Sequence, residues 1–365
     1  MSTVEIKVNP AYAADIEAGL LNHAAERIRT TIPQCDRFYI ITSPPVRKHW
    51  GAALAASFDA AGMQYAILEM KDGERFKTLA TVKDLAEKMV RLGADRKSII
   101  VALGGGVTGD VAGFLASIYM RGIGFVQIPT TFLAQVDASV GGKTGVDLRV
   151  GKNLVGTFHQ PRRVLIDPNV LSTLPEREYR SGLYEALKCG IISNPEIFRF
   201  MEEHRDRILR RDPSALEWLI TKSVRVKAEV VAADEHEGGL RRILNFGHTI
   251  GHALEAETGY KHFLHGEAVA WGMIAATTIA AELQHTDAAT AERIISAILT
   301  YAPLPKVEAR GKRILHRLAN DKKTMRGIVH FILPVNIGRV EVVSNVPAGA
   351  VMQAVDRLRS RSQEQ

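Results

Sequence analysis

Two histidines four residues apart, His248 and His252, have the clearest spacing for metal chemistry in this chain. Residues four apart lie on one face of a helix, so both rings could present a nitrogen to a single metal ion. Gly247 and Gly251 are also four residues apart, so the same helix should have a stripe of surface without side chains. Another backbone or a ligand can come close along this stripe. Taken alone, the pair is also compatible with two ordinary helical histidines that bind no metal.

A second candidate site is the glycine cluster 104–106. It follows the apolar run 98–103, which is typical of a buried strand, and a helical pattern begins directly after it. Glycines let the backbone approach a pyrophosphate, and the free amides and dipole of a helix N-terminus stabilise its charge. This order of elements indicates a dinucleotide site, with a simple tight turn as the alternative.

Lys143 and Lys152 stand in a third candidate segment, 129–156, which is dense in small and polar residues. A lysine among glycines has little surface on which to lay its stem, so both ammonium groups are expected to project as compact charges suited to carboxylate or phosphate. A solvated surface loop is the alternative. The net charge of +7 is spread along the chain without a basic block, which favours a small anionic ligand over nucleic acid.

The elements that must position these residues fall into two parts. Short β-rich runs (4–8, 38–42, 65–69, 98–103, 124–128, 164–167) alternate with helical patterns such as 46–61 and 78–92. This alternation predicts an α/β fold that begins with a Rossmann-like, mostly parallel sheet. Long helical patterns follow from about residue 172, with one hairpin at 328–333 and 339–343. We therefore expect an α/β domain at 1–170 and a mainly α-helical domain at 171–365.

Helix-end signals and the composition allow two further predictions, about one helix and about the location of the protein. Asn245 is placed to cap the helix that carries His248, and Gly259 to end it. Only two cysteines occur, the N-terminal segment lacks a secretion signal, and the most apolar stretch, 268–281, is shorter than the roughly 20 residues of a membrane helix. These features predict a cytoplasmic protein without a membrane segment.

Six segments occur in this order along the chain: GGGVTGDVAGF, IPTTFLAQVDASVGGKTGVD, GKNLVGTFHQP, LYEALK, RRILNFGHTIGHALE and HGEAVAWGM. Together they closely resemble the 3-dehydroquinate synthase family. The match extends from about Thr42 to Gly338. It implies a lyase of the shikimate pathway, which leads to chorismate and the aromatic amino acids. The implied reaction converts 3-deoxy-D-arabino-heptulosonate 7-phosphate into 3-dehydroquinate and phosphate, through transient oxidation by NAD, phosphate elimination, re-reduction and intramolecular aldol closure.

The resemblance also implies roles for individual residues. The family's divalent metal, zinc or cobalt, is held by residues that match Glu185, His248 and His265. His252 is then expected to meet substrate and help move protons at the hydroxyl being oxidised. The other substrate-binding residues match Arg121, Asp137, Lys143, Lys152, Asn153, Lys188, Lys227, Arg241 and Asn245, with one of Lys322 and Lys323. The NAD site matches Glu74, Lys77, Gly105, Gly106, Asp110, Thr130, Thr131, Thr173, Leu174 and Glu178, and Asp137, Lys143 and Lys152 are expected to serve it as well.

The resemblance also implies an oligomeric state. Arg121 corresponds to an arginine that reaches the phosphate from the neighbouring subunit, which implies a homodimer. Two positions depart from the family pattern: Ser43, where Asp or Asn near the adenosine ribose is common, and Tyr184, where a small or aliphatic residue usually precedes the metal glutamate. Ser43 leaves one ribose contact undecided.

Three alternative functions stay open: a cyclase for sedoheptulose 7-phosphate or glucose 6-phosphate, a polyol dehydrogenase that releases NADH, and a non-catalytic binding protein.

Overall fold

The computed structural model describes residues 1–35, 37–319 and 329–364, which form two compact units. Unit 1 comprises Met1–Pro175 and Arg211–Ala232, and unit 2 comprises Glu176–Arg210 and Ala233–Gln365. The predicted fold class, a mostly parallel α/β sheet followed by mainly helical structure, is confirmed. The predicted single boundary at residue 170 differs from this division, because 211–232 belongs to unit 1. Helical periodicity shows which side chains are buried but not on which unit they pack.

Unit 1 is built on a sheet of seven described strands in the order β1-β2-β9-β6-β5-β3-β4. All neighbouring pairs are parallel except β1 with β2. The strands are β1 (Ser2–Ile6), β2 (Tyr12–Ile16), β3 (Arg37–Thr42), β4 (Gln64–Glu69), β5 (Ile99–Gly104), β6 (Gly124–Pro129) and β9 (Arg163–Ile166). The chain adds β4 outside β3 and then β6 outside β5, so the strand order reverses between β3 and β5. Ligands of open α/β sheets bind beyond the carboxyl ends of the strands at such a switch point.

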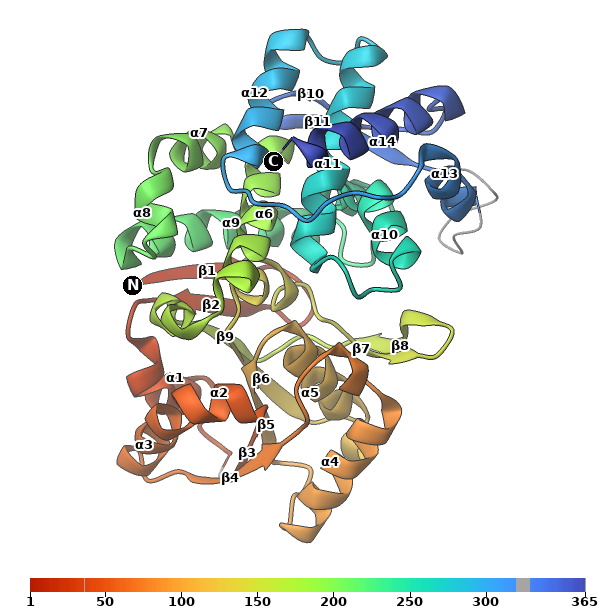
Figure 1. The fold of residues 1–365 in the computed structure, drawn as a ribbon. Helices are drawn as coiled ribbons and strands as arrows, with labels where there is room; N and C mark the ends of the chain where they lie inside the picture. Colours follow the sequence, from red (N-terminus) through yellow and green to blue (C-terminus); the bar gives the residue numbers. More distant parts are fainter. Residues whose placement is uncertain (36, 320–328, 365) are drawn as a thin grey trace. The chain divides into compact units, whose positions relative to one another are not determined.

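Helices cover both faces of this sheet (Figure 1). Ile40 and Val101 share an apolar cluster with residues of α1 and α3, whereas Ile41 and Ile100 belong to a cluster with α4 and α5. Successive strand residues point to opposite faces, which is why these strands are apolar throughout rather than alternating. The helices of unit 1 are α1 (Ala24–Thr31), α2 (Pro44–Val46), α3 (Ala52–Ala60), α4 (Leu79–Arg91), α5 (Gly106–Ile118) and the part of α9 (Pro213–Ala233) up to Ala232.

A separate antiparallel hairpin in unit 1 consists of β7 (Lys143–Leu148) and β8 (Gly151–Phe158). The sequence analysis did not predict these strands, because glycine and lysine have low β propensity. Close backbone packing explains the glycines: a Cβ atom at Gly145 would lie 2.6 Å from the carbonyl oxygen of Val155. The part of the third candidate segment that carries Lys143 and Lys152 is therefore an ordered hairpin.

Unit 2 is organised around α11 (His265–Glu282), which is buried along most of its length. Figure 1 shows α11 beside α6, α10, α12 and α14, and it contacts all four. The other elements are α6 (Glu176–Ile192), α7 (Pro195–Glu203), α8 (Arg205–Leu209), α10 (His248–Glu257), α12 (Ala288–Leu299), α13 (Gly311–Ala319), α14 (Ala348–Gln363) and the hairpin of β10 (Phe331–Asn336) with β11 (Arg339–Val343). Among the described residues, no helix is both long and apolar enough to cross a membrane.

Candidate metal and cofactor sites

The predicted metal ligands Glu185, His248 and His265 converge within unit 2. Glu185 Oε1 lies 3.7 Å from Nε2 of His248 and 3.7 Å from Nε2 of His265. The Glu185 side chain is 1% exposed, and its Oε1 accepts no hydrogen bond from the described residues. A buried carboxylate oxygen without a donor, facing two imidazole nitrogens, fits a divalent ion such as Zn²⁺ or Co²⁺, which binds nitrogen and oxygen ligands.

His252 lies beside this set. The rings of His248, His252 and His265 are neighbours, and one nitrogen from each lies within 4.8 Å of the others. Two ligand sets are therefore geometrically available, one with Glu185 and two histidines and one with three histidines. The first set leaves His252 beside the metal site and outside the ligand set.

Glycines bring the histidines together. His248 begins α10 and His265 begins α11, and the two helices cross at very close range. A Cβ atom at Gly251 would lie 2.9 Å from the carbonyl oxygen of Ala268, so only glycine allows this approach. The stripe predicted from Gly247 and Gly251 accommodates the backbone of another helix.

The start of α10 differs from the prediction. Gly247 occupies the N-cap position with a left-handed φ of 82° and no side-chain cap bond, so the expected capping by Asn245 is wrong. Asn245 instead ends a 3-10 helix, 240–245, and its Nδ2 donates to Oε1 of Glu237 at 3.2 Å. Gly259 follows the end of α10 with a φ of 61°, as a helix stop requires.

The charges around the metal site favour neutral histidine. Burial, reinforced by the positive charge of Lys188, holds the pKa of His248 well below its usual range. A neutral imidazole keeps the lone pair that a metal ligand needs. The Lys188 ammonium forms an ion pair with Oε2 of Glu185, while Oε1 of Glu185 faces the two histidines.

Glu255 is a functional candidate that the sequence analysis missed. Its Oε2 lies 3.6 Å from Nδ1 of His265, and its side chain is 7% exposed. A carboxylate on the second ring nitrogen fixes the orientation and tautomer of a metal-binding histidine. The available signal was its spacing, two helical turns after His248 on the same face of α10.

Predicted NAD-binding residues gather beyond the carboxyl end of β5 in unit 1. Gly105 is the N-cap of α5 and Gly106 its first residue, so the amides of that turn are available to an anion. A Cβ at Gly105 would lie 2.8 Å from Cγ2 of Thr131, which explains the need for glycine. The amide of Thr130 donates to the carbonyl of Gly104 at 2.9 Å. This placement at the switch point agrees with the predicted dinucleotide site.

Lys77 connects the predicted cofactor and substrate residues of unit 1. Its buried Nζ lies 2.5 Å from Oδ2 of Asp110 and donates to Oδ1 of Asn153 at 2.5 Å. Burial alone would lower the pKa of Lys77, but Asp110, Glu74 and Asp147 together raise it above its ordinary value. The lysine is therefore charged and holds β8 against the loop before α4.

Further contacts order the same hairpin. Asp147 Oδ1 accepts from the amide of Asn153 at 2.8 Å, and Asn153 adopts a left-handed φ of 53°. Asp147 is thus another residue that the motifs did not single out. Lys152 pairs with Glu74 at 3.1 Å. Elsewhere in unit 1, Lys227 of α9 pairs with Asp137 at 2.7 Å.

The remaining predicted residues are more dispersed. Thr173 Oγ1 accepts from Nε1 of Trp50 at 2.8 Å, and Leu174 follows it in unit 1, whereas Glu178 lies on α6 in unit 2. Lys143 and Arg121 are exposed.

Ser43 is buried directly after β3, at the switch point. Tyr184 is buried next to Glu185, and this burial raises the pKa of its hydroxyl. Lys322 and Lys323 lie outside the described residues.

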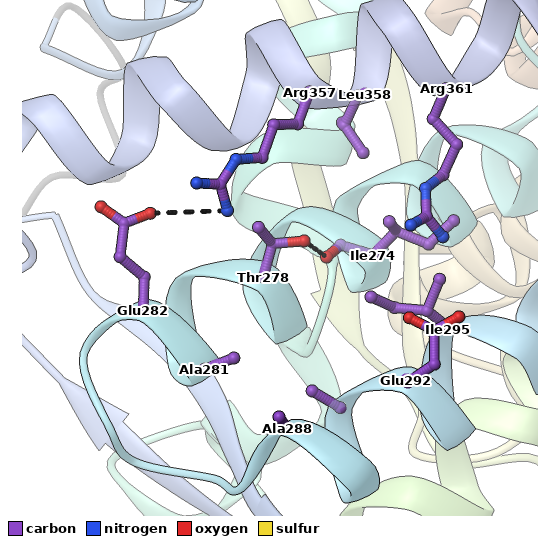
Figure 2. A pocket seen from close by; sticks show the side chains of 11 residues that line it. Ile274, Thr278, Ala281, Glu282, Ala288, Glu292, Ile295, Arg357, Leu358 and Arg361 are labelled. Atoms are coloured by element: carbon purple, nitrogen blue, oxygen red, sulfur yellow. Dashed lines mark hydrogen bonds and ion pairs between the residues drawn. The ribbon is translucent and has the colours of Figure 1, made fainter.

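A cavity of about 250 Å³ between α11, α12 and α14 lies apart from these residues (Figure 2). Its lining on α11 starts at Ile274, about 14 Å along the helix from His265. Arg357 and Glu282 form an ion pair at 3.9 Å on its rim. No predicted site residue is among its described lining residues.

Comparison with known proteins identifies the family. Models described as 3-dehydroquinate synthase N-terminal and 3-dehydroquinate synthase C-terminal match residues 67–181 and 182–324. The 3-dehydroquinate synthase of Koribacter versatilis is 64% identical over 93% of both chains, and that of Solibacter usitatus is 50% identical over 94% of this chain and 95% of its own.

Solved structures agree with this assignment. A 2-deoxy-scyllo-inosose synthase complexed with carbaglucose-6-phosphate, NAD⁺ and Co²⁺ is 29% identical, with a TM-score of 0.86 over 98% of this chain and 99% of its own. The 2-epi-5-epi-valiolone synthase of Streptomyces hygroscopicus, with NAD⁺ and Zn²⁺ bound, is 29% identical, with a TM-score of 0.87 over 96% of this chain and 97% of its own. By its motifs, fold and relatives, this chain belongs to the 3-dehydroquinate synthase family.

Proposed function

We propose that this chain converts 3-deoxy-D-arabino-heptulosonate 7-phosphate into 3-dehydroquinate and phosphate, as a step of the shikimate pathway. Membership of the family supports the reaction class. The observation that carries the assignment to particular residues is the convergence of Glu185, His248 and His265, with Glu185 Oε1 lacking a hydrogen bond from the described residues. These residues would hold the divalent metal, and the residues around Gly105 and Lys77 would hold NAD.

The cofactors would supply the redox chemistry. When bound, the divalent ion would acidify a neighbouring substrate hydroxyl and NAD would provide a transient hydride acceptor, so no net NADH would form. His252, beside the metal site, would take the hydroxyl proton. The carbonyl formed acidifies the adjacent C–H bond, and loss of that proton expels phosphate. We propose that the departing phosphate accepts this proton.

Charged residues of the chain would bind the two anionic ends of the substrate. Arg241 has a planar guanidinium that can fork onto the carboxylate. Lys143, Lys152, Lys188 and Lys227 would supply compact positive charge, although Lys152, Lys188 and Lys227 each pair with a carboxylate in the structure. Exchange of those protein carboxylates for substrate anions would be part of binding.

The decisive experiment measures phosphate release from the heptulosonate phosphate with NAD and Zn²⁺ or Co²⁺, with and without a chelator. We expect turnover that the chelator abolishes and no net NADH at 340 nm. His265→Ala should remove activity. His285→Ala is a matched control, because His285 pairs with Glu341 away from the candidate ligands.

Other outcomes would redirect the proposal. Normal turnover by metal-replete His265→Ala would refute the ligand assignment. Release of phosphate only from sedoheptulose 7-phosphate or glucose 6-phosphate would indicate another sugar-phosphate cyclase. Net NADH from glycerol, without phosphate release, would indicate a polyol dehydrogenase.

Assembly and location complete the proposal. A homodimer would let Arg121 reach the phosphate in the neighbouring subunit. Its exposure supports this role, as does the exposure of Ile118 (47%) and Met120 (42%) around it. The infrequent cysteines support a reducing compartment such as the cytoplasm.

A further inference from the structure

Asp234, a carboxylate to which the motifs assign no role, is bound by the turn that follows α9. Its Oδ1 accepts from the amide of Gly238 at 2.7 Å. Its Oδ2 accepts from the amides of Gly239 at 2.7 Å and Arg241 at 3.0 Å. Backbone amides that converge on one anion form a concave anion-binding nest. Here the anion is a side chain of the turn itself.

The turn has a backbone shape that needs such an anchor. Glu237 adopts a left-handed φ of 63°, which L-residues rarely hold without supporting contacts. A Cβ at Gly239 would meet no atom within 4 Å, so packing against that position does not restrain the turn. Since Asp234 binds amides on both sides of Gly239, its carboxylate closes the turn.

The same turn carries two side chains that the proposed function places on the substrate. Arg241 is bonded through its own amide to Asp234, and its Nη1 donates to the carbonyl of Glu235 at 2.5 Å. Asn245 donates to Glu237 at 3.2 Å. Arg241 is only 3% exposed, and the carbonyl of Glu235 that receives its Nη1 belongs to the same turn, so the turn helps to orient the guanidinium.

We propose that Asp234 is a positioning residue that holds Arg241, and through Glu237 also Asn245, in the arrangement that receives the substrate carboxylate. The inference rests on the proposed function and assigns Asp234 no contact with substrate. The amide donors of Arg241, Gly239 and Gly238 lower the pKa of Asp234 to about 2, so its carboxylate is charged at neutral pH.

The test compares Asp234→Ala with the wild-type enzyme in the phosphate-release assay with NAD and divalent metal. We expect KM for the heptulosonate phosphate to rise about tenfold, with a smaller change in kcat, because charged hydrogen bonds that orient Arg241 are lost. Formate, a small carboxylate that can occupy the vacated nest, should restore KM in the variant. It should not change KM of the wild-type enzyme at the same ionic strength.

Asp287→Ala is the matched control. Asp287 caps α12 by accepting from the amide of Thr290 at 2.8 Å and from its hydroxyl at 2.7 Å, in a part of unit 2 without a predicted site residue. The Asp287→Ala variant loses a carboxylate that, like Asp234, accepts a hydrogen bond from a backbone amide. Its KM should stay at the wild-type value, and formate should have no effect.

Hydrogen exchange of the peptide spanning 234–241 tests the turn without relying on activity. Protection should fall in Asp234→Ala and return with formate. Wild-type protection and KM in that variant would overturn the proposal, as would a raised KM that formate leaves unchanged. Absence of phosphate release from the wild-type enzyme would refute the proposed function, while exchange would still report whether Asp234 holds the turn.

Discussion

The carbonyl oxygen of Gly247 occupies the space that a Cβ atom of Gly272 would need. This contact holds α10 directly against α11, and these helices carry His248 and His265 at their first positions. The metal site therefore depends on a backbone approach between Gly247, which directly precedes His248, and Gly272, two helical turns after His265. Enlarging Gly272 should separate the two histidines without changing either.

Gly272→Ala should destabilise unit 2 by about 2 kcal/mol through overpacking and reduce bound metal. Gly349→Ala is the control, because a Cβ there meets nothing within 4 Å and alanine favours the helix by up to about 1 kcal/mol. Urea unfolding and metal analysis would measure both effects. Normal stability and metal content in Gly272→Ala would contradict the packing argument.

The two possible ligand sets predict different behaviour for His252. If Glu185, His248 and His265 bind the metal, His252→Ala should keep its metal and lose most turnover, while Glu185→Ala should lose both. Measuring both the metal content, by mass spectrometry, and phosphate release in each variant distinguishes the two ligand sets. Loss of metal from His252→Ala with retention in Glu185→Ala would assign the ion to the three histidines.

The Lys77 and Asp110 pair offers a coupling test. Lys77→Met should destabilise unit 1 by about 3 kcal/mol and weaken NAD binding, because it leaves a partly buried carboxylate without its charge partner. Lys77→Met with Asp110→Asn should cost less than the two single changes added together. Unfolding curves and NAD titration provide the measurement, and simple additivity would show that the pair is not coupled.

The pH dependence of Asp234 follows from its lowered pKa. A carboxylate whose folded-state pKa is near 2 stabilises the fold fully above its ordinary pKa of 3.8 and loses that contribution as pH falls from about 4 toward 2. The stability difference between wild type and Asp234→Asn should be constant from pH 7 to 5 and shrink below pH 4. Urea midpoints across this range test it, and a difference that grows on acidification would have the wrong sign.

Complementation between inactive subunits tests the proposed homodimer. In a mixed dimer of Arg121→Ala and His265→Ala chains, one site receives both an intact Arg121 and an intact His265. Co-expression should therefore restore about a quarter of wild-type activity, if half the dimers are mixed and each has one working site. Each variant alone should stay inactive, and no recovery in verified mixed dimers would argue that Arg121 acts within its own subunit.

Local and periodic information explains how much was predictable from the sequence. The run 98–103 with its following glycines predicted a buried strand and a helix N-terminus, because apolar patterning and glycine conformational freedom are local properties. The helical pattern 78–92, which the structure shows as α4 (Leu79–Arg91), was predicted for the same reason. The hairpin β7–β8 was missed because its pairing depends on close backbone contact at Gly145, which no local propensity indicates.

The sequence by itself determined the family, the fold class and the residue types of the candidate sites, because motif order and hydrophobic periodicity are properties of the amino-acid sequence. Only the tertiary structure decided that Glu185 Oε1 faces both His248 and His265, that Glu255 lies beside His265, and that Asp234 closes the turn of Arg241. Glu185 and the two histidines are distant in sequence and meet through the packing of separate helices. Asp234 and Arg241 are close in sequence, but the turn must fold before its amides converge on one carboxylate.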